Sequence, residues 1–167
     1  MPPDSQPRFA GVLARHAGRI VLVREEYAAW GGAYWNIPSG RIEDHESPAE
    51  GASRELAEET GLVVRPGDLV LQSTSAVTSG VRGADTVSRA WNFSVAVHDP
   101  TLRVDDPDEL IQEARWFSTE EAMRLLRELP YRPLSEPALA ILEGQVEPGV
   151  HWAYSDPRSR PSVTRQE

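Results

Sequence analysis

The chain has 167 residues, of which 40% are apolar and 26% charged, and it carries a formal net charge of −9. These values predict one soluble globular domain with its own core, and the acidic balance argues against a nucleic-acid polymer as a partner. The absence of cysteine excludes disulfides, thiolate metal sites and thiol nucleophiles. No apolar run reaches the length of a membrane span and no signal segment opens the sequence, so we expect a cytoplasmic protein without membrane contact.

The N-terminal part predicts a β-hairpin. Residues 1–7 are polar and proline-rich and are expected to form a flexible lead-in. Residues 8–14 and 19–24 are rich in apolar side chains, and residues 16–18 between them favour a turn. The second run is almost entirely apolar, which is typical of a central strand. Arg24 at its end is either a surface residue or a phosphate contact, because a guanidinium group can donate two hydrogen bonds to phosphate oxygens.

An aromatic segment follows the hairpin. Residues 25–34 contain two tyrosines, a tryptophan and adjacent glycines, which indicates a loop. Trp30 and its neighbours either stack on a base or ribose of a ligand or cover one edge of the core. Residues 35–38 predict a short strand that ends at its proline and leads into a turn at Ser39 and Gly40.

Residues 48–60 are predicted to form a helix. Ser47 can cap the free amides at the helix start, Pro48 suits the first helical position, and Glu50 completes a capping box. Gly61 is a typical helix stop. Both ends of the helix are therefore defined by local signals.

The predicted helix has an apolar face that we expect to pack on a sheet. Ala49, Ala52 and Leu56 fall on one narrow stripe when successive residues are turned by about 100°. Gly51 destabilises the helix interior by roughly 1 kcal/mol relative to alanine. We therefore expect another group to approach the helix closely at Gly51.

The same helix carries a cluster of carboxylates. Glu55, Glu58 and Glu59 are spaced i, i+3, i+4, which places them within one turn on one side of the helix. At about 5 Å and an effective dielectric constant near 20, each pair repels by roughly 3 kcal/mol. On a hydrated surface the repulsion would be weak and the cluster would indicate no function. In a cleft the group would need a hard divalent cation, such as Mg²⁺ or Mn²⁺ shared with substrate phosphates.

Strands dominate the remainder, and helices come late. We expect strands at residues 69–76, 87–97 and 114–117, loops at 78–86 and 99–109, and helices at 118–128 and 135–143. This order predicts the α+β class, with a mixed sheet between helices, for one domain over residues 8–144. Residues 145–167 are expected to form a tail, which Trp152 and Tyr154 could anchor to the domain or to another subunit.

The segment from Gly40 to Leu62 resembles the Nudix box, the signature of Nudix hydrolases (MutT-like pyrophosphohydrolases). The signature specifies nine positions, and all nine agree: Gly40, Glu46, Arg54, Glu55, Leu56, Glu58, Glu59, Gly61 and Leu62. One departure precedes the box, because Ser39 stands where the family often has glycine. Residues 114–118, followed by an acidic helix, resemble the closing strand and helix of the family. The resemblance covers roughly residues 8–126.

The resemblance implies a Nudix-type α/β/α sandwich and a metal-dependent hydrolase. The implied reaction cuts a pyrophosphate bond in a nucleoside triphosphate or in a nucleoside diphosphate linked to another moiety, with Mg²⁺ or Mn²⁺ as cofactor. Glu55, Glu58 and Glu59 match the metal-binding glutamates, and the main-chain carbonyl of Gly40 often joins them. The implied partner is therefore a nucleotide-type small molecule, and because the family is often dimeric, the resemblance also allows a homodimer.

The resemblance leaves the general base open. Glu46 and Arg54 match supporting positions that fix the loop before the helix. In some family members the base is the glutamate that matches Glu55, and in others it is an acidic residue on a distant loop. Glu109 and Glu113 are the candidates for such a residue here.

The substrate is not defined by the signature. The downstream marks of ADP-ribose pyrophosphatases and of dinucleoside polyphosphate hydrolases are missing from residues 77–80, which leaves a nucleoside triphosphate or a nucleotide sugar open. Arg82 and Arg89 are candidate phosphate contacts beside Arg24 and Trp30. The alternative is a catalytically silent Nudix-fold binding or regulatory domain, but such domains commonly lose box glutamates. The related isomerases use a cysteine, which this chain lacks.

Overall fold

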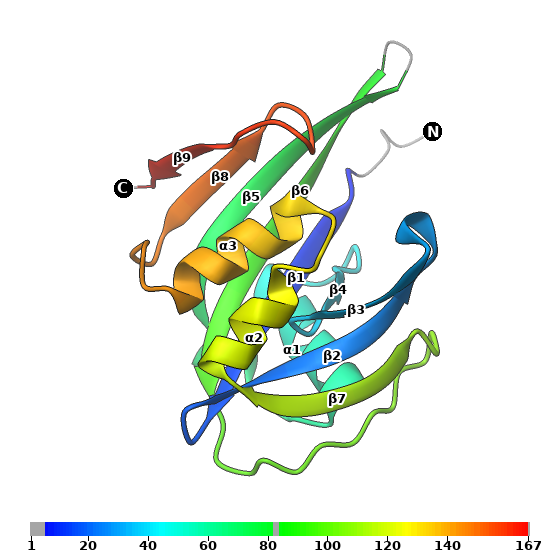
Figure 1. Cartoon of the computed structure of the whole chain (residues 1–167), viewed down its shortest axis with the longest axis vertical. Coiled ribbons are helices and arrows are strands. Elements are labelled where there is room, and N and C mark those ends of the chain that lie inside the picture. The colour runs from blue at the N-terminus through cyan, green and yellow to red at the C-terminus, as the bar shows by residue number, and fades with distance from the viewer. Residues whose placement is uncertain (1–5, 82–83, 167) are drawn as a thin grey trace.

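The computed structural model describes residues 6–81 and 84–166, which fold into nine strands, three α-helices and two short 3₁₀ helices (Figure 1). The strands are β1 (Arg8–His16), β2 (Arg19–Tyr27), β3 (Gly32–Asn36), β4 (Ser39–Arg41), β5 (Val70–Val81), β6 (Ala84–Ala96), β7 (Ile111–Ser118), β8 (Val150–Tyr154) and β9 (Ser162–Arg165). The helices are α1 (Pro48–Thr60), α2 (Thr119–Leu126) and α3 (Arg132–Leu142), with 3₁₀ turns at Ala28–Trp30 and Pro66–Asp68.

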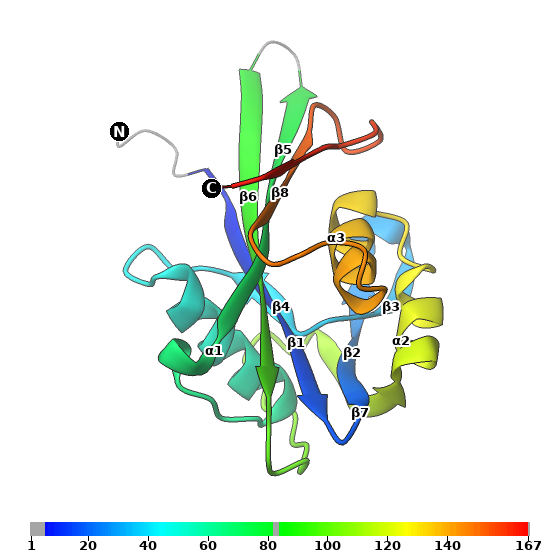
Figure 2. The same cartoon turned by 90° about the vertical axis from the view of Figure 1, so that its left-hand side faces the viewer.

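The helices cover both faces of one mixed sheet, which confirms the predicted α/β/α sandwich. The strand order is β3-β2-β1-β6-β5-β8-β9, with β4 paired to β1 and β7 paired to β2. β1 runs parallel to β6, and β5 runs parallel to β8. Helix α1 lies on one side of the strands, and α2 and α3 lie on the other (Figure 2). No helix in the described ranges is long and apolar enough to cross a membrane.

Strands β1 and β2 separate as they leave the turn that joins them (Figure 2). They pair only at Arg15 with Ile20 and at His16 with Arg19. Beyond this point β1 pairs with β6 and β4, whereas β2 pairs with β3 and β7. The separation gives the sheet two diverging halves, and residues from both halves line one cavity, among them Phe9 of β1 and Tyr27 of β2.

Helix α1 has the predicted bounds because local signals define both of its ends. The hydroxyl of Ser47 accepts a hydrogen bond from the amide of Glu50, and the carboxylate of Glu50 accepts one from the amide of Ser47 at 2.7 Å. At the other end Gly61 has a φ of 79°, a left-handed conformation that favours glycine.

The inner face of α1 packs on the sheet as predicted. Leu56 and Ala52 are fully buried in a cluster that includes Val12 of β1 and Val21 of β2. The close approach expected at Gly51 is made by the loop that precedes the helix. A Cβ at Gly51 would lie 3.1 Å from Cγ1 of Ile42 and 3.2 Å from Oε2 of Glu46.

The connection between β5 and β6 is more regular than predicted. We expected a loop over residues 78–86, but β5 continues to Val81 and β6 begins at Ala84, and Ser79 pairs with Thr86 and Gly80 with Asp85. Cross-strand pairing thus overrides the weak strand propensity of Gly80. The third helix also starts earlier than predicted, at Arg132, because Pro133 suits the first helical turn.

The expected C-terminal tail needs correction, because residues 150–154 and 162–165 add two strands to the sheet. β8 pairs in parallel with β5, and β9 pairs with β8. Val150, Trp152 and Tyr154 point alternately inward and are buried against Val77 and Ala140. Trp152 and Tyr154 therefore attach this segment to the domain. The sequence did not indicate that β8 would pair with the edge of β5.

Candidate active site

Arg54 holds the loop before α1 against the acidic face of the helix. Its guanidinium group donates two hydrogen bonds to Glu46, at 2.7 and 3.0 Å, and one to the carbonyl of Arg41 at 2.8 Å. It also contacts Glu55 at 2.8 Å and Glu58 at 3.1 Å. The forked contact with Arg54 lowers the pKa of Glu46 below its usual value. The supporting roles implied for Glu46 and Arg54 thus have a direct geometric counterpart.

Glu59 is the most deeply buried of the three glutamates clustered on α1, with 5% of its surface exposed. Its carboxylate accepts a hydrogen bond from the amide of Ser39 at 3.0 Å. Burial, with additional repulsion from Glu25 and Glu55, raises the pKa of Glu59 to about 10. Glu59 consequently retains a proton at neutral pH unless a positive charge stabilises its ionised form.

Glu55 packs directly against the main chain at Gly40. A Cβ at Gly40 would lie 2.2 Å from the carboxyl carbon of Glu55 and 2.4 Å from each of its oxygens. The backbone at Gly40 does not have a positive φ, so the requirement for glycine here is one of space. Burial raises the pKa of Glu55, although its contact with Arg54 acts in the opposite direction. The strand β4 and the helix α1 therefore bring a main-chain segment and a carboxylate into contact.

This group of oxygen donors suits a hard divalent cation. Glu59 is buried and Glu55 is partly buried beside other carboxylates, and the close approach at Gly40 places main-chain atoms next to Glu55. Carboxylate and carbonyl oxygens are the ligands that Mg²⁺ and Mn²⁺ prefer. A cation would stabilise the ionised forms that burial and mutual repulsion now disfavour.

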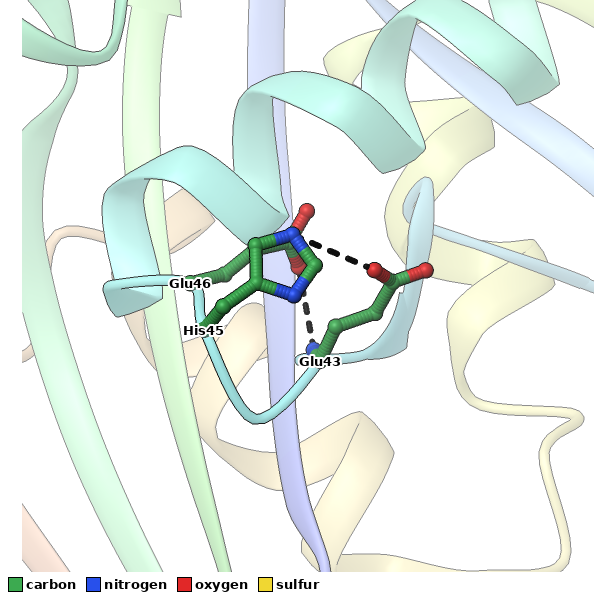
Figure 3. Close-up of side chains that lie close together, drawn as sticks. All are labelled: Glu43, His45 and Glu46. Carbon is green, nitrogen blue, oxygen red and sulfur yellow. Dashed lines mark hydrogen bonds and ion pairs between the residues drawn. The ribbon is translucent and has the colours of Figure 1, made fainter.

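A second acidic group lies in the loop before α1 (Figure 3). Glu43, His45 and Glu46 offer one ligand atom each, and these atoms lie within 4.8 Å of one another. Glu43 and His45 are exposed, and Glu46 is already engaged by Arg54 and by the amide of Glu43. The sequence did not single out this group, because its members fall outside the i, i+3, i+4 pattern of the helix.

A cavity of about 510 Å³ opens beside the carboxylates. Ser39, Gly40 and Glu25 form its border with the box, and Tyr27, Trp30 and Tyr131 are among the residues that form its aromatic wall. The ring of Trp30 stacks on Tyr27, with centroids 4.3 Å apart, and on Tyr131 at 5.8 Å. The cavity thus combines an apolar, aromatic region with an acidic end.

The predicted substrate contacts are distributed unevenly around this cavity. Trp30 and Arg89 line it. Arg24 is exposed and pairs in register with Glu113 of β7, and it is not among the residues that line the cavity. Arg82 lies outside the described residues. The structure therefore brings two of the four predicted contacts to the cavity.

The loop before β7 contributes a different acidic residue from those predicted. Glu109 is exposed, and Glu113 forms an ion pair with Arg115. The charge that this loop brings to Glu55 and Glu59 is that of Asp106, which contributes to the raised pKa of both. The loop is held there because the amide of Asp105 donates a hydrogen bond to the carbonyl of Glu58 at 2.8 Å.

Glu25 and Asp106 are thus two acidic residues near the box that sequence reasoning missed. Glu25 follows the apolar run of β2, two residues after the buried Val23, and this inward alternation was an available signal. Burial raises its pKa, and it lines the cavity. Asp106 gave no comparable signal, since it lies in an acidic loop with several similar residues.

Comparisons with known proteins show which proteins the chain is similar to. A Mycobacterium tuberculosis protein named "Putative 8-oxo-dGTP diphosphatase 3" is 31% identical over 130 residues, which are 74% of this chain and 56% of that protein. An octanoyltransferase of Myxococcus xanthus is 49% identical over 136 residues, which are 81% of this chain and 36% of that protein. The chain therefore spans only part of the length of these relatives.

Solved structures and a family model place the chain among proteins of one fold. The crystal structure of the MutT protein from Bacillus halodurans has a TM-score of 0.65 at 18% identity, covering 95% of this chain and 96% of that one. The NUDIX domain model matches residues 4–137, which is most of the chain. With its nine matching box positions and its α/β/α sandwich, the protein belongs to the NUDIX domain family.

Proposed function

We propose that this protein is a metal-dependent pyrophosphohydrolase that acts on a nucleoside triphosphate or on a nucleoside diphosphate linked to another group. The observation that carries the proposal is the contact between Glu55 and Gly40 at the border of an aromatic cavity. This contact supports a site in which the box carboxylates lie next to a space that suits a nucleoside. The family membership and the diphosphatase name of the M. tuberculosis relative support the same reaction class.

Glu55, Glu58, Glu59 and the carbonyl of Gly40 would hold Mg²⁺ or Mn²⁺. A cation bound there neutralises phosphate charge and lowers the pKa of a bound water. The amide of Ser39 orients the carboxylate of Glu59, and Arg54 orients those of Glu55 and Glu58. Burial raises the pKa of Glu55 and of Glu59, and a nearby cation would favour their ionised, metal-binding forms.

The cavity would bind the nucleoside part of the substrate. The aromatic wall of Tyr27, Trp30 and Tyr131 offers apolar surface against which a base could pack, and such aromatic contacts are tolerant of base identity. Arg89 would contact a phosphate at the polar side of the cavity. Glu55 would act as the general base, since its raised pKa suits a group that accepts a proton, and the nearby charge of Asp106 contributes to that raised pKa.

The proposal is tested with a panel of nucleotides and two matched variants. The panel contains nucleoside triphosphates, including 8-oxo-dGTP, together with ADP-ribose, nucleotide sugars and dinucleoside polyphosphates, each with Mg²⁺ or Mn²⁺. We expect a nucleoside monophosphate among the products and loss of turnover in EDTA. Glu58→Gln should lower kcat by on the order of 100-fold, because it removes one charged ligand. Glu120→Gln, the same change at an exposed position on α2, should have no effect.

Unchanged turnover in a Glu58→Gln preparation free of wild-type enzyme would show that the metal site is assigned wrongly. Tight nucleotide binding without turnover of any compound would favour the silent binding domain instead. Binding is measured by calorimetry on the same protein samples.

A further inference from the structure

The cavity has a wall that comes from outside the box, namely the first turn of α3. Tyr131, Pro133 and Leu134 line the cavity from this turn. Tyr131 also stacks on Trp30 with an interplanar angle of 23°, so its position determines the outer end of the aromatic wall. Any group that moves the first turn of α3 will therefore change the shape of the proposed nucleoside site.

The start of α3 has no side-chain cap. Tyr131 is the N-cap residue, and its side chain makes no capping hydrogen bond. The segment before it contains Pro130, which donates no backbone hydrogen bond. The amides of Leu134 and Ser135 donate to the carbonyl of Tyr131 at 3.1 and 3.4 Å, and the elements that α3 packs against also contribute to its position.

The C-terminal strand β8 supplies part of this packing support. The hydroxyl of Tyr154 donates a hydrogen bond to Oε2 of Glu136 at 2.9 Å, and Arg132 donates to Oε1 of Glu136 at 2.8 Å. Both oxygens of Glu136 are thus engaged, one by β8 and one by the first turn of α3. Arg132 also reaches the carbonyl of Arg158 in the β8–β9 connection at 3.5 Å.

Tyr154 is at the same time anchored to the opposite wall of the cavity. It is 1% exposed and pairs in register with Val77 of β5, which lines the cavity. Figure 1 shows β8 lying along β5, with α3 in front of this part of the sheet. The hydroxyl of Tyr154 therefore links the two walls, β5 and α3, without touching the space between them.

We propose that Tyr154, acting through Glu136 and Arg132, is a positioning residue that holds the Tyr131 wall and so sets the affinity for the nucleoside part of the substrate. The proposal rests on the proposed function for the identity of the ligand. It assigns the C-terminal strand a role in substrate recognition rather than in the chemistry at the carboxylates.

The test compares Tyr154→Phe with Arg127→Gln. Tyr154→Phe removes only the hydroxyl that reaches Glu136. Arg127→Gln breaks the ion pair of Arg127 with Glu143 beyond the other end of α3, at 2.6 Å, and serves as the matched control. We expect Tyr154→Phe to raise KM about fivefold, with kcat and Mg²⁺ dependence unchanged, because one hydrogen bond is lost away from the metal ligands. The control should leave KM unchanged.

A second readout needs no turnover. The stacked rings of Trp30 and Tyr131 should give a band in the near-ultraviolet circular dichroism spectrum. This band is identified by subtracting the spectrum of Trp30→Phe from that of wild type. This band should weaken in Tyr154→Phe and persist in Arg127→Gln. If Tyr154→Phe does not fold, Glu136→Gln, which keeps an acceptor for Tyr154 but loses the ion pair with Arg132, takes its place in both measurements.

An unchanged KM and an unchanged ring-stack band in Tyr154→Phe would overturn the proposal, as would equal effects in both variants. Failure of the proposed function is a separate result, because wild type would then hydrolyse no nucleotide of the panel. In that case the circular dichroism band alone decides whether Tyr154 positions Tyr131.

Discussion

Gly40→Ala is the most incisive test of the proposed metal site, because it adds one methyl group at the point where β4 meets α1. The new Cβ would lie 2.2 Å from the carboxyl carbon of Glu55. Ordinary contact between carbon atoms is roughly 3.5 Å, so the carboxylate must retreat by about 1 Å. The backbone at Gly40 has no positive φ, so alanine meets no conformational penalty there.

The displacement of Glu55 determines how much activity Gly40→Ala is expected to lose. A displacement of about 1 Å at a catalytic group can cost about 100-fold in rate, which corresponds to about 2.7 kcal/mol. The free energy of unfolding should fall by only about 1–2 kcal/mol, because a flexible side chain can move aside. Activity and stability are therefore expected to respond differently. Steady-state kcat with the best nucleotide of the panel and urea unfolding in EDTA measure the two effects.

Two further variants make this test specific. Gly67→Ala is the matched control, because a Cβ there would meet no atom within 4 Å and the backbone has no positive φ. Glu55→Asp in the Gly40→Ala background shortens the side chain by one methylene and should recover part of the lost rate. Full activity and unchanged Mg²⁺ dependence in Gly40→Ala would refute the assignment of Glu55 and Gly40 to one site.

Three other predictions concern stability. Leu56→Ala should lower the free energy of unfolding by about 2–5 kcal/mol in urea, because Leu56 is fully buried, whereas Val63→Ala, at a position 87% exposed, should change it by less than about 0.5 kcal/mol. Glu46→Gln should lower the free energy of unfolding by about 2 kcal/mol, since it removes the charged partner of Arg54. A melting temperature equal to that of wild type would contradict this prediction. The third prediction concerns pH. The pKa of Glu59 is about 10 in the folded protein and 4.5 ordinarily. Between these pH values the folded protein therefore binds one more proton than the unfolded chain. In EDTA, stability should therefore fall as pH rises from 5 to 9, and equal slopes for wild type and Glu59→Gln would exclude Glu59 as the cause.

Much of the box could be predicted because its signals are local. The capping box of Ser47 and Glu50 and the left-handed Gly61 fix α1 within a few residues of each end, and the observed bounds agree with the prediction. Other features depended on distant partners. The segment with Trp152 and Tyr154 alternates like a strand, yet only the free edge of β5 decides that it becomes one.

The sequence by itself determined the helix that carries the carboxylates and the family to which the chain belongs. These follow from spacing along one segment, where hydrogen bonds and side-chain periodicity connect residues a few positions apart. The tertiary structure decided which groups share the environment of Glu59. Glu25 and Asp106 come from segments remote in sequence, brought there by the sheet and by the loop that crosses the end of α1. Such contacts depend on strand pairing and packing over the whole domain, which no local pattern encodes.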